Sequence, residues 1–343
     1  MMQRLFFIGD SNSLSLPKWA GLCCIQRLPK SLTFLFFEIM QQLKPVFFTF
    51  YWIILFLPPL QSQQVADSAF SFDIKNPIYA RGMGPVITLD EAHSNFHTLS
   101  GRYYPFGQLL QKDGYILKSG HEAFSSSYLS GLKILVIANA LSGTGLWRLP
   151  TRSAFSKDEI LSLNQWVSGG GSLLLIADHM PFAGAAAQLA LSFGFNFIDG
   201  FAHRKDDNLE MFSRGKNNLA SSRITNGRNN SERIDSILFF TGQSFIAPKD
   251  ATVISFLNDD YEILLPEVAW QFNDTTPRLS GQGLVNGAYM EYGKGRVVVM
   301  GEAAMFSAQV SGPQRNKAGM NHSDARQNPQ FLLNLIHWLD RKL

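Results

Sequence analysis

The stretch over residues 169–182, GGGSLLLIADHMPF, constrains the fold more than any other part of this chain. Three glycines end a preceding helix, and the apolar run at 172–177 predicts a buried strand. Asp178 and His179 follow at the point where that strand ends. Because ligands of open α/β sheets bind beyond the carboxyl ends of the strands, this pair is placed for binding or for chemistry.

Other segments repeat the alternation of strand and helix. The segments expected to be strands are 85–89, 114–117, 132–138, 251–257 and 268–272, with a hairpin formed by 288–292 and 296–300. The segments expected to be helices are 104–110, a stretch that begins after Ser156 with a capping box to Glu159, 183–193 and 329–339. This alternation predicts an α/β fold with a mostly parallel, doubly wound sheet and a late β-hairpin.

Residues 203–230 differ in character from the rest of the chain. They are rich in Arg, Lys, Asn and Asp and show no sustained hydrophobic period. We expect a polar surface insertion or lid in this part of the chain.

Charge and cysteine content exclude several classes of function. The formal net charge of +3 arises in residues 1–62, which leave 25 Lys or Arg and 25 Asp or Glu for the remainder. This balance does not indicate a nucleic-acid partner. Both cysteines, Cys23 and Cys24, lie in the leading segment, so disulfides, thiolate catalysis and cysteine metal sites are excluded from the rest.

The leading segment indicates export. The apolar run at 46–57 is shorter than the roughly 20 residues that span a bilayer, and it suits the apolar region of a signal peptide. We expect translation to start at Met40, with residues 1–39 as an over-extended start; the alternative is a genuine extension. We divide the chain into a leader or membrane anchor at 1–62, a connector at 63–84 and a domain at 85–343. The expected location is periplasmic or extracellular, with 46–57 as the anchor if the leader is retained.

Polar side chains gather at three predicted strand ends. They are Asp90, Glu91, His93 and His97 after the first strand, Asp178 and His179 after the fourth, and Glu302 after the hairpin. Because parallel strands bring their carboxyl ends to one edge of the sheet, we expect one ligand-binding cleft. The alternative is that these carboxylates cap helix starts and need no ligand.

Two kinds of chemistry are compatible with this set. His93 and His97 are four residues apart and could ligate a metal together with Asp90, Asp178 or His179, although the sequence lacks an HExxH motif. Alternatively, His179 beside Asp178, or Glu302 facing a histidine, could move protons. Ser94 and Ser307 are available but carry no nucleophile motif, so water would have to be activated. The chain has no Walker or GxGxxG loop and does not indicate a cofactor.

Over residues 85–343 the chain resembles the class I glutamine amidotransferase-like superfamily. The resemblance rests on the combination of three segments, DEAHSNFHT, QWVSGGGSLLLIADHMPFAG and VVVMGEAAMFS. Within it, the chain is most similar to an uncharacterised bacterial family of exported or membrane-associated proteins. The resemblance implies a flavodoxin-like, doubly wound fold. In glutaminase members a cysteine follows the strand equivalent to 172–177. Here that turn reads Asp178-His179-Met180, so glutaminase activity is not expected.

We therefore expect an exported domain that binds a small polar ligand, for which a carbohydrate or a cell-envelope fragment is one candidate. A metal-assisted or acid–base hydrolase is one alternative. The other is a scaffold subunit with membrane-associated protein partners, for which the polar insertion would be the docking surface.

Overall fold

The computed structural model describes residues 64–145 and 147–343. The predictions on Met40, on the apolar run at 46–57 and on the leader as a whole lie outside these residues. No helix in the described ranges combines the length and the apolar character that crossing a bilayer requires.

A sheet of nine strands forms the centre of the domain. Its parallel part consists of β2 (Val86–Asp90), β3 (Ile116–Gly120), β4 (Ile134–Ala138), β5 (Ser172–Ile176) and β15 (Gly295–Met300). Their spatial order is β3-β2-β4-β5-β15, which is 2-1-3-4-5 when the five are numbered along the chain. This is the strand order of the flavodoxin-like fold, so the predicted fold class is confirmed.

The sheet continues beyond β15 with antiparallel strands. They are β14 (Val285–Tyr292), β11 (Thr252–Phe256), β10 (Phe245–Ile246) and β6 (Asn196–Phe197). β14 and β15 form the expected late hairpin, in which Tyr292 pairs with Gly295 across a two-residue turn. The strand expected at 268–272 does not form, because only Val268 makes an isolated bridge, to Arg148.

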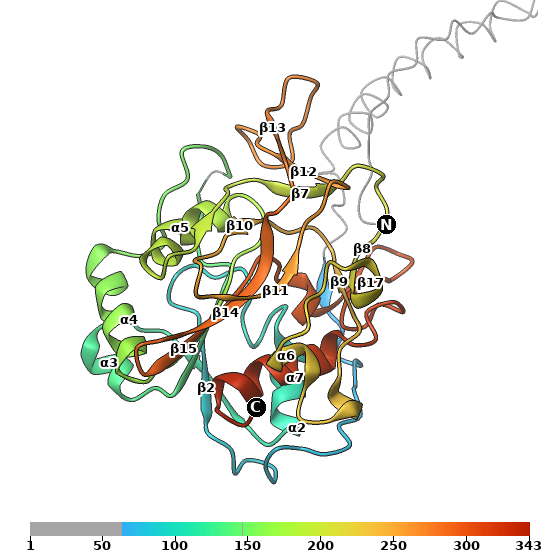
Figure 1. The fold of residues 1–343 in the computed structure, drawn as a ribbon. Coiled ribbons are helices and arrows are strands. Elements are labelled where there is room, and N and C mark those ends of the chain that lie inside the picture. Colours follow the sequence, from blue (N-terminus) through green and yellow to red (C-terminus); the bar gives the residue numbers. More distant parts are fainter. Residues whose placement is uncertain (1–63, 146) are drawn as a thin grey trace, which may run out of the picture. The chain divides into compact units, whose positions relative to one another are not determined.

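Helices cover both faces of the sheet (Figure 1). One face carries α2 (Tyr104–Lys112), α6 (Arg223–Asn226) and α7 (Asn328–Leu339); the other carries α3 (Ser126–Ser130), α4 (Lys157–Gly169) and α5 (Phe182–Ser192). The capping box predicted from Ser156 and Glu159 starts α4. The parallel strands are buried on both faces because side chains alternate between the two helical layers, which explains their continuous apolar runs.

Smaller sheets surround this centre. They consist of β1 (Val65–Ala66), β16 (Ala308–Ser311) and β17 (Asn316–Gly319); of β7 (Phe201–Arg204), β12 (Tyr261–Leu264) and β13 (Arg278–Ser280); and of β8 (Glu210–Ser213) and β9 (Ser236–Phe239). Three single 3-10 turns are η1 (Arg214–Lys216), η2 (Asn230–Glu232) and η3 (Ala304–Phe306).

The segment at 203–230, expected to be a polar surface insertion, is more ordered than its composition indicates. It contains β8 and α6, and α6 packs against α7. Leu219 and Ile224 are buried in the main hydrophobic core. Its few apolar residues are irregularly spaced, so they give no helical or strand period in the sequence, although the folded chain buries them.

Candidate functional site

The switch point of the sheet lies between β2 and β4, where strand order reverses and ligands of this fold class bind. In this protein the loop after β2 crosses that point. The Asn95 side-chain amide donates to Asp90 Oδ2 (3.0 Å) and to the Ala138 carbonyl (3.3 Å), and the Phe96 amide donates to the Asn139 carbonyl (3.0 Å). The protein's own loop therefore covers the position at which a ligand was expected.

His93 is held between two carboxylates. Its Nδ1 lies 2.9 Å from Asp90 Oδ1, and its Nε2 lies 2.9 Å from Glu159 Oε1. Burial lowers the pKa of His93, but hydrogen bonds and charges from Asp90 and Glu159 outweigh burial and raise it. Both ring nitrogens are thus engaged with protein groups, which leaves neither free to ligate a metal.

His97 lies in a different environment from His93. It is 2% exposed, its ring packs 4.5 Å from that of Tyr103, and neither of its nitrogens has a hydrogen-bond partner among the described residues. Burial, with a smaller effect of the Arg102 charge, lowers the pKa of His97 to about 3. The ring is therefore neutral, and it does not converge with His93 on a shared point.

The structure therefore does not support the hypothesis of a metal site ligated by His93 and His97. In the part of the chain that the structure describes, no three His, Cys, Asp or Glu side chains are arranged to hold a metal ion. Glu91 has a local role, since its Oε1 accepts hydrogen bonds from the Leu99 amide (2.7 Å) and the Ser119 hydroxyl (2.8 Å).

Asp178 and Glu302 do lie together, at the ends of β5 and β15. The Asp178 amide donates to the Asn139 side chain (2.9 Å), and its carboxylate accepts from the amide of His179 and from that of Ala303. Glu302 is fully buried, and its two oxygens accept from the first amides of η3, those of Ala304 (2.8 Å) and Met305 (2.7 Å). The capping alternative therefore describes Glu302 well.

A third carboxylate, that of Glu210 on β8, joins this pair. Burial and the negative charge of Asp178 raise the pKa of Glu210 to about 8, and the same two causes hold the pKa of Glu302 well above its usual value. Sequence reasoning missed Glu210 because it lies within the segment assigned to a surface insertion.

Unpaired polar atoms accompany these acids. The side-chain amide of Gln243 and Oδ1 of Asn286 are buried without partners among the described residues. The backbones of Gln243 and Asn286 both bond to Gly301, one residue before Glu302. Since a buried unpaired polar group costs about 1–3 kcal/mol, these atoms suit enclosed water or a polar ligand group.

His179 sits at the outer side of this region, in an aromatic cluster. Its Nδ1 lies 2.6 Å from the Met180 carbonyl, so Nδ1 carries the proton, and the structure gives Nε2 no hydrogen-bond partner among the described residues. The ring stacks on Phe201 (4.5 Å) and meets Trp270 edge-on (4.6 Å). Trp270 is 53% exposed, and Phe272 beside it is 39% exposed.

We call His179, Trp270 and Phe272 the aromatic rim. Of these three residues His179 was among the predicted site residues, whereas Trp270 and Phe272 were not. The sequence signal was a tryptophan and a phenylalanine two residues apart, which was interpreted as a strand. Trp270 has a left-handed backbone (φ 67°), a conformation that bulky residues adopt rarely and that breaks a strand.

No protein-family model matches the chain, and no curated protein matches it. Among solved structures, the mmIFT52 N-terminal domain is similar with a TM-score of 0.51 and 15% identity, covering 74% of this chain and 96% of that one. A cytoplasmic protein from Salmonella typhimurium (TM-score 0.43, 16% identity, 74% and 98% covered) and a protein from Bacteroides uniformis named ThuA-like (0.42, 11%, 78% and 94%) are also similar.

The likeness concerns the fold alone. Two proteins named ThuA-like are among the similar structures. The strand order of this chain is itself that of the flavodoxin-like class of α/β folds. The narrower resemblance to an exported or membrane-associated family stays a prediction.

Proposed function

We propose that this domain binds a small polar ligand with a flat apolar face at the aromatic rim, and that a carbohydrate is the first class to test. The observation that carries the proposal is His179. Its tautomer is fixed by the Met180 carbonyl, and its Nε2 is left as a hydrogen-bond acceptor on a ring that contacts the exposed Trp270.

Sugars combine hydroxyl donors with apolar ring faces, so they match this pairing of an imidazole acceptor with exposed aromatic rings. Trp270 and Phe272 supply surface for stacking, and His179 Nε2 supplies an acceptor for a hydroxyl. The carboxylate of Asp178, one residue before His179, accepts a hydrogen bond from the His179 amide (2.9 Å).

The rim narrows the set of residues first expected to touch a ligand. Asp178 is 7% exposed, and Asp90 and Glu302 are 1% and 0% exposed, each bonded within the protein. His179 is likewise 7% exposed, but its Nε2 has no hydrogen-bond partner among the described residues. We therefore assign direct contact to the exposed rings of Trp270 and Phe272 and to His179 Nε2, and a supporting role to the acids, whose carboxylates already accept hydrogen bonds within the protein.

Isothermal titration of the purified full chain with a panel of mono- and oligosaccharides tests this proposal. For a sugar that binds, Trp270→Ala should weaken the affinity about tenfold, in line with the ~1.4 kcal/mol of a well-packed aromatic contact. Leu191→Ala and Ile246→Ala are matched controls, because these side chains are 60% and 55% exposed elsewhere. The proposal fails if no sugar binds or if Trp270→Ala binds as tightly as the wild type.

Acid–base hydrolysis is the second candidate, and the same histidine favours it. A neutral imidazole with a fixed Nδ1 proton and an open Nε2 is the form that removes a proton from water. The orienting group is the Met180 carbonyl rather than Asp178, and Glu302 faces backbone amides rather than a histidine. Loss of kcat at saturating substrate in His179→Ala, measured on a glycoside or ester panel, would support this candidate, because the loss of a binding contact alone raises KM and leaves kcat unchanged.

We also propose, from the sequence alone, that the protein is exported. The alternative function, that of a scaffold subunit in a membrane-associated complex, likewise rests on the sequence. N-terminal sequencing of the secreted product tests export, and a mature chain that begins upstream of Met40 would contradict the start proposed here. For the scaffold alternative, substitutions of exposed residues within 203–230 should abolish complex formation while the rim variants leave it intact.

A further inference from the structure

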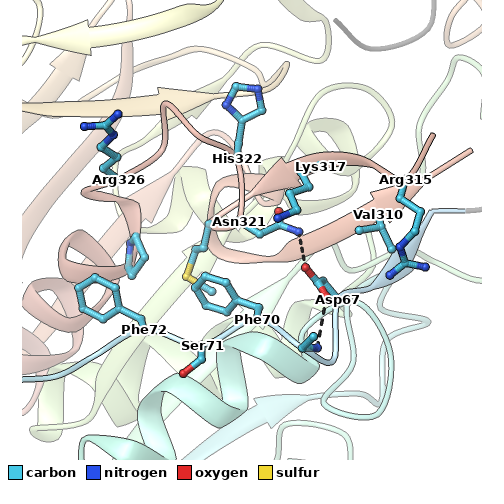
Figure 2. A pocket seen from close by; sticks show the side chains of 13 residues that line it. Asp67, Phe70, Ser71, Phe72, Val310, Arg315, Lys317, Asn321, His322 and Arg326 are labelled. Atoms are coloured by element: carbon cyan, nitrogen blue, oxygen red, sulfur yellow. Dashed lines mark hydrogen bonds between the residues drawn. The ribbon is translucent and has the colours of Figure 1, made fainter.

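A surface groove of about 650 Å³ lies away from the strand ends, between the segment that follows β1, the β16–β17 hairpin and the start of α7 (Figure 2). Its volume falls within the range of about 300–1,000 Å³ that ligand sites occupy. None of the residues predicted from the sequence lines it.

One side of the groove is basic. Figure 2 shows Arg326, His322, Lys317 and Arg315 following one another along this side. Arg315 and Lys317 form no ion pair with any residue in the described ranges. Arg326 donates from Nε to the Ser323 carbonyl (3.2 Å) and likewise has no acidic partner there. The three side chains are exposed, and the neighbouring acid Asp324 lies 3.9 Å from His322 and forms no ion pair with any of the three.

The acid that lines the groove, Asp67, does not neutralise this wall. It is 8% exposed, and its carboxylate is engaged by the Asn321 side-chain amide (2.9 Å) and by the Ala69 amide (3.2 Å). The bond from Asn321, drawn in Figure 2, holds the segment after β1 against the chain beyond β17, and the bond from Ala69 is local to that segment. Asp67 therefore builds the groove, and the basic wall stays open to an anionic partner.

The opposite side is apolar. Phe70 and Phe72 are half-buried and pack on the main core, and Met320, which also lines the groove, is 4% exposed. Phe70 and Phe72 are two residues apart and lie along the groove opposite the basic row (Figure 2). A partner must therefore carry negative charge along one side and apolar groups along the other.

We propose that this groove binds an extended acidic peptide segment in which Asp or Glu alternates with apolar residues. In an extended chain successive side chains point to opposite sides, so such a sequence sends its carboxylates to Arg315, Lys317 and Arg326 and its apolar side chains to Phe70 and Phe72. Charge complementarity then supplies the specificity.

Two other occupants fit less well. Residues 1–62 of this chain carry five Lys or Arg against two Asp or Glu, so the leader repels the basic wall. A flat anionic bilayer cannot reach Phe70 and Phe72, because these rings line a concave surface beside a wall of long side chains. An extended peptide is narrow enough to enter this groove and to contact both rings.

Fluorescence anisotropy with the purified full chain and a labelled peptide of alternating Glu and Leu tests the proposal. We expect saturable binding that weakens steeply between about 50 and about 300 mM salt, because exposed charges are screened over this range. A peptide of alternating Gln and Leu, and one of alternating Glu and Gly, should each bind at least about tenfold more weakly.

Variants of the basic wall locate the site. Lys317→Gln with Arg326→Gln should weaken binding about tenfold or more, whereas Lys118→Gln with Lys249→Gln, two exposed lysines elsewhere, should leave it unchanged. Arg315→Gly removes a charge at a left-handed position (φ 50°) that glycine adopts freely, so lost binding there cannot be ascribed to unfolding.

Three results would overturn the proposal. They are equal binding of the Gln-Leu peptide, competition by inorganic phosphate or heparin at the concentration at which the Glu-Leu peptide competes, and unchanged binding by the Lys317 and Arg326 variant. Trp270→Ala should bind the peptide as the wild type does, so the groove and the aromatic rim are tested independently.

Discussion

His93 Nε2 lies 2.9 Å from Oε1 of Glu159, a residue 66 positions further along the chain. The same Glu159 carboxylate accepts from the Ser156 amide (2.9 Å) and so completes the capping box of α4. One acid therefore starts a helix and fixes the loop that leaves β2. The loop covers the switch point of the sheet because this contact, together with Asp90, holds it there.

The first prediction concerns the pH dependence of this contact. The pKa of His93 is raised above 6.5 in the folded protein, so its contribution to stability is complete below about pH 6.5 and is lost as the pH rises through the folded pKa. The pKa of Glu159 is lowered to about 2, because hydrogen bonds from Ser156, His93 and Phe124 outweigh burial. Its contribution is complete above pH 4.5 and is lost as the pH falls toward 2.

His93→Gln should therefore destabilise the protein most between about pH 4.5 and 6.5, by about 2–4 kcal/mol, and less at about pH 8.5. Urea unfolding of both proteins at about pH 5.5 and about pH 8.5 measures the difference. A penalty that is the same or larger at the higher pH would contradict the ion pair.

The second prediction concerns Glu210. Its folded pKa of about 8 exceeds 4.5, so the folded state holds a proton that the unfolded chain releases, and stability falls as the pH rises from 4.5 through 8. Glu210→Gln should raise the melting temperature at about pH 8.5, by about 2–4 °C per kcal/mol regained, and change it little at about pH 5. Glu267→Gln, at an exposed glutamate, should have no such effect. If the wild type and Glu210→Gln had equal melting temperatures at about pH 8.5, ionisation of Glu210 would not destabilise the folded protein, and the prediction would be wrong.

The third prediction concerns His337, which lies in α7. It is 1% exposed, and its Nε2 lies 2.6 Å from Oδ2 of Asp113, itself fully buried. His337→Ala leaves that carboxylate without its partner and should cost about 3–5 kcal/mol. Asp113→Asn keeps an oxygen for the Ile78 amide and a donor for His337, so it should cost about 1–2 kcal/mol. Denaturant unfolding checks this order, with His121→Ala as the exposed control; a reversed order would refute it.

The fourth prediction concerns the close approach of Gly242 to the end of β15. A Cβ at Gly242 would meet the Gly301 carbonyl and lie 2.9 Å from the Glu302 Cβ, so Gly242→Ala should destabilise by about 1–3 kcal/mol. In contrast, a Cβ at Gly169, within α4, meets nothing within 4 Å. Gly169→Ala should stabilise by about 0.5–1 kcal/mol. Thermal unfolding of the two variants is the measurement, and a neutral Gly242→Ala would show that the turn relaxes.

The parallel strands could be predicted because their signal is local. A strand buried on both faces needs an unbroken apolar run, and the segments at 132–138 and 172–177 display it. The start of α4 could also be predicted from the sequence, since Ser156 and Glu159 form their capping box within one helical turn.

The site could be predicted less completely. Successive side chains of a strand point to opposite faces of the sheet. Polar residues at the carboxyl ends of neighbouring strands can therefore lie on opposite faces and fail to form one site. Asp178 and Glu302 interact with each other, whereas His93 packs among Phe124 and Phe155 on the other face. Trp270 contacts His179, and Glu210 lies near Asp178, only through folding, because each pair joins separate loops or strands.

The sequence by itself determined the strand and helix periods, and with them an α/β sheet whose strand ends carry acids and histidines, because hydrophobic periodicity and capping act within a few residues. The tertiary structure decided which of those groups are buried and paired, which ring is left with an open nitrogen, and where a basic wall faces two phenylalanines. These outcomes depend on contacts between residues far apart in the chain, and no local pattern encodes them.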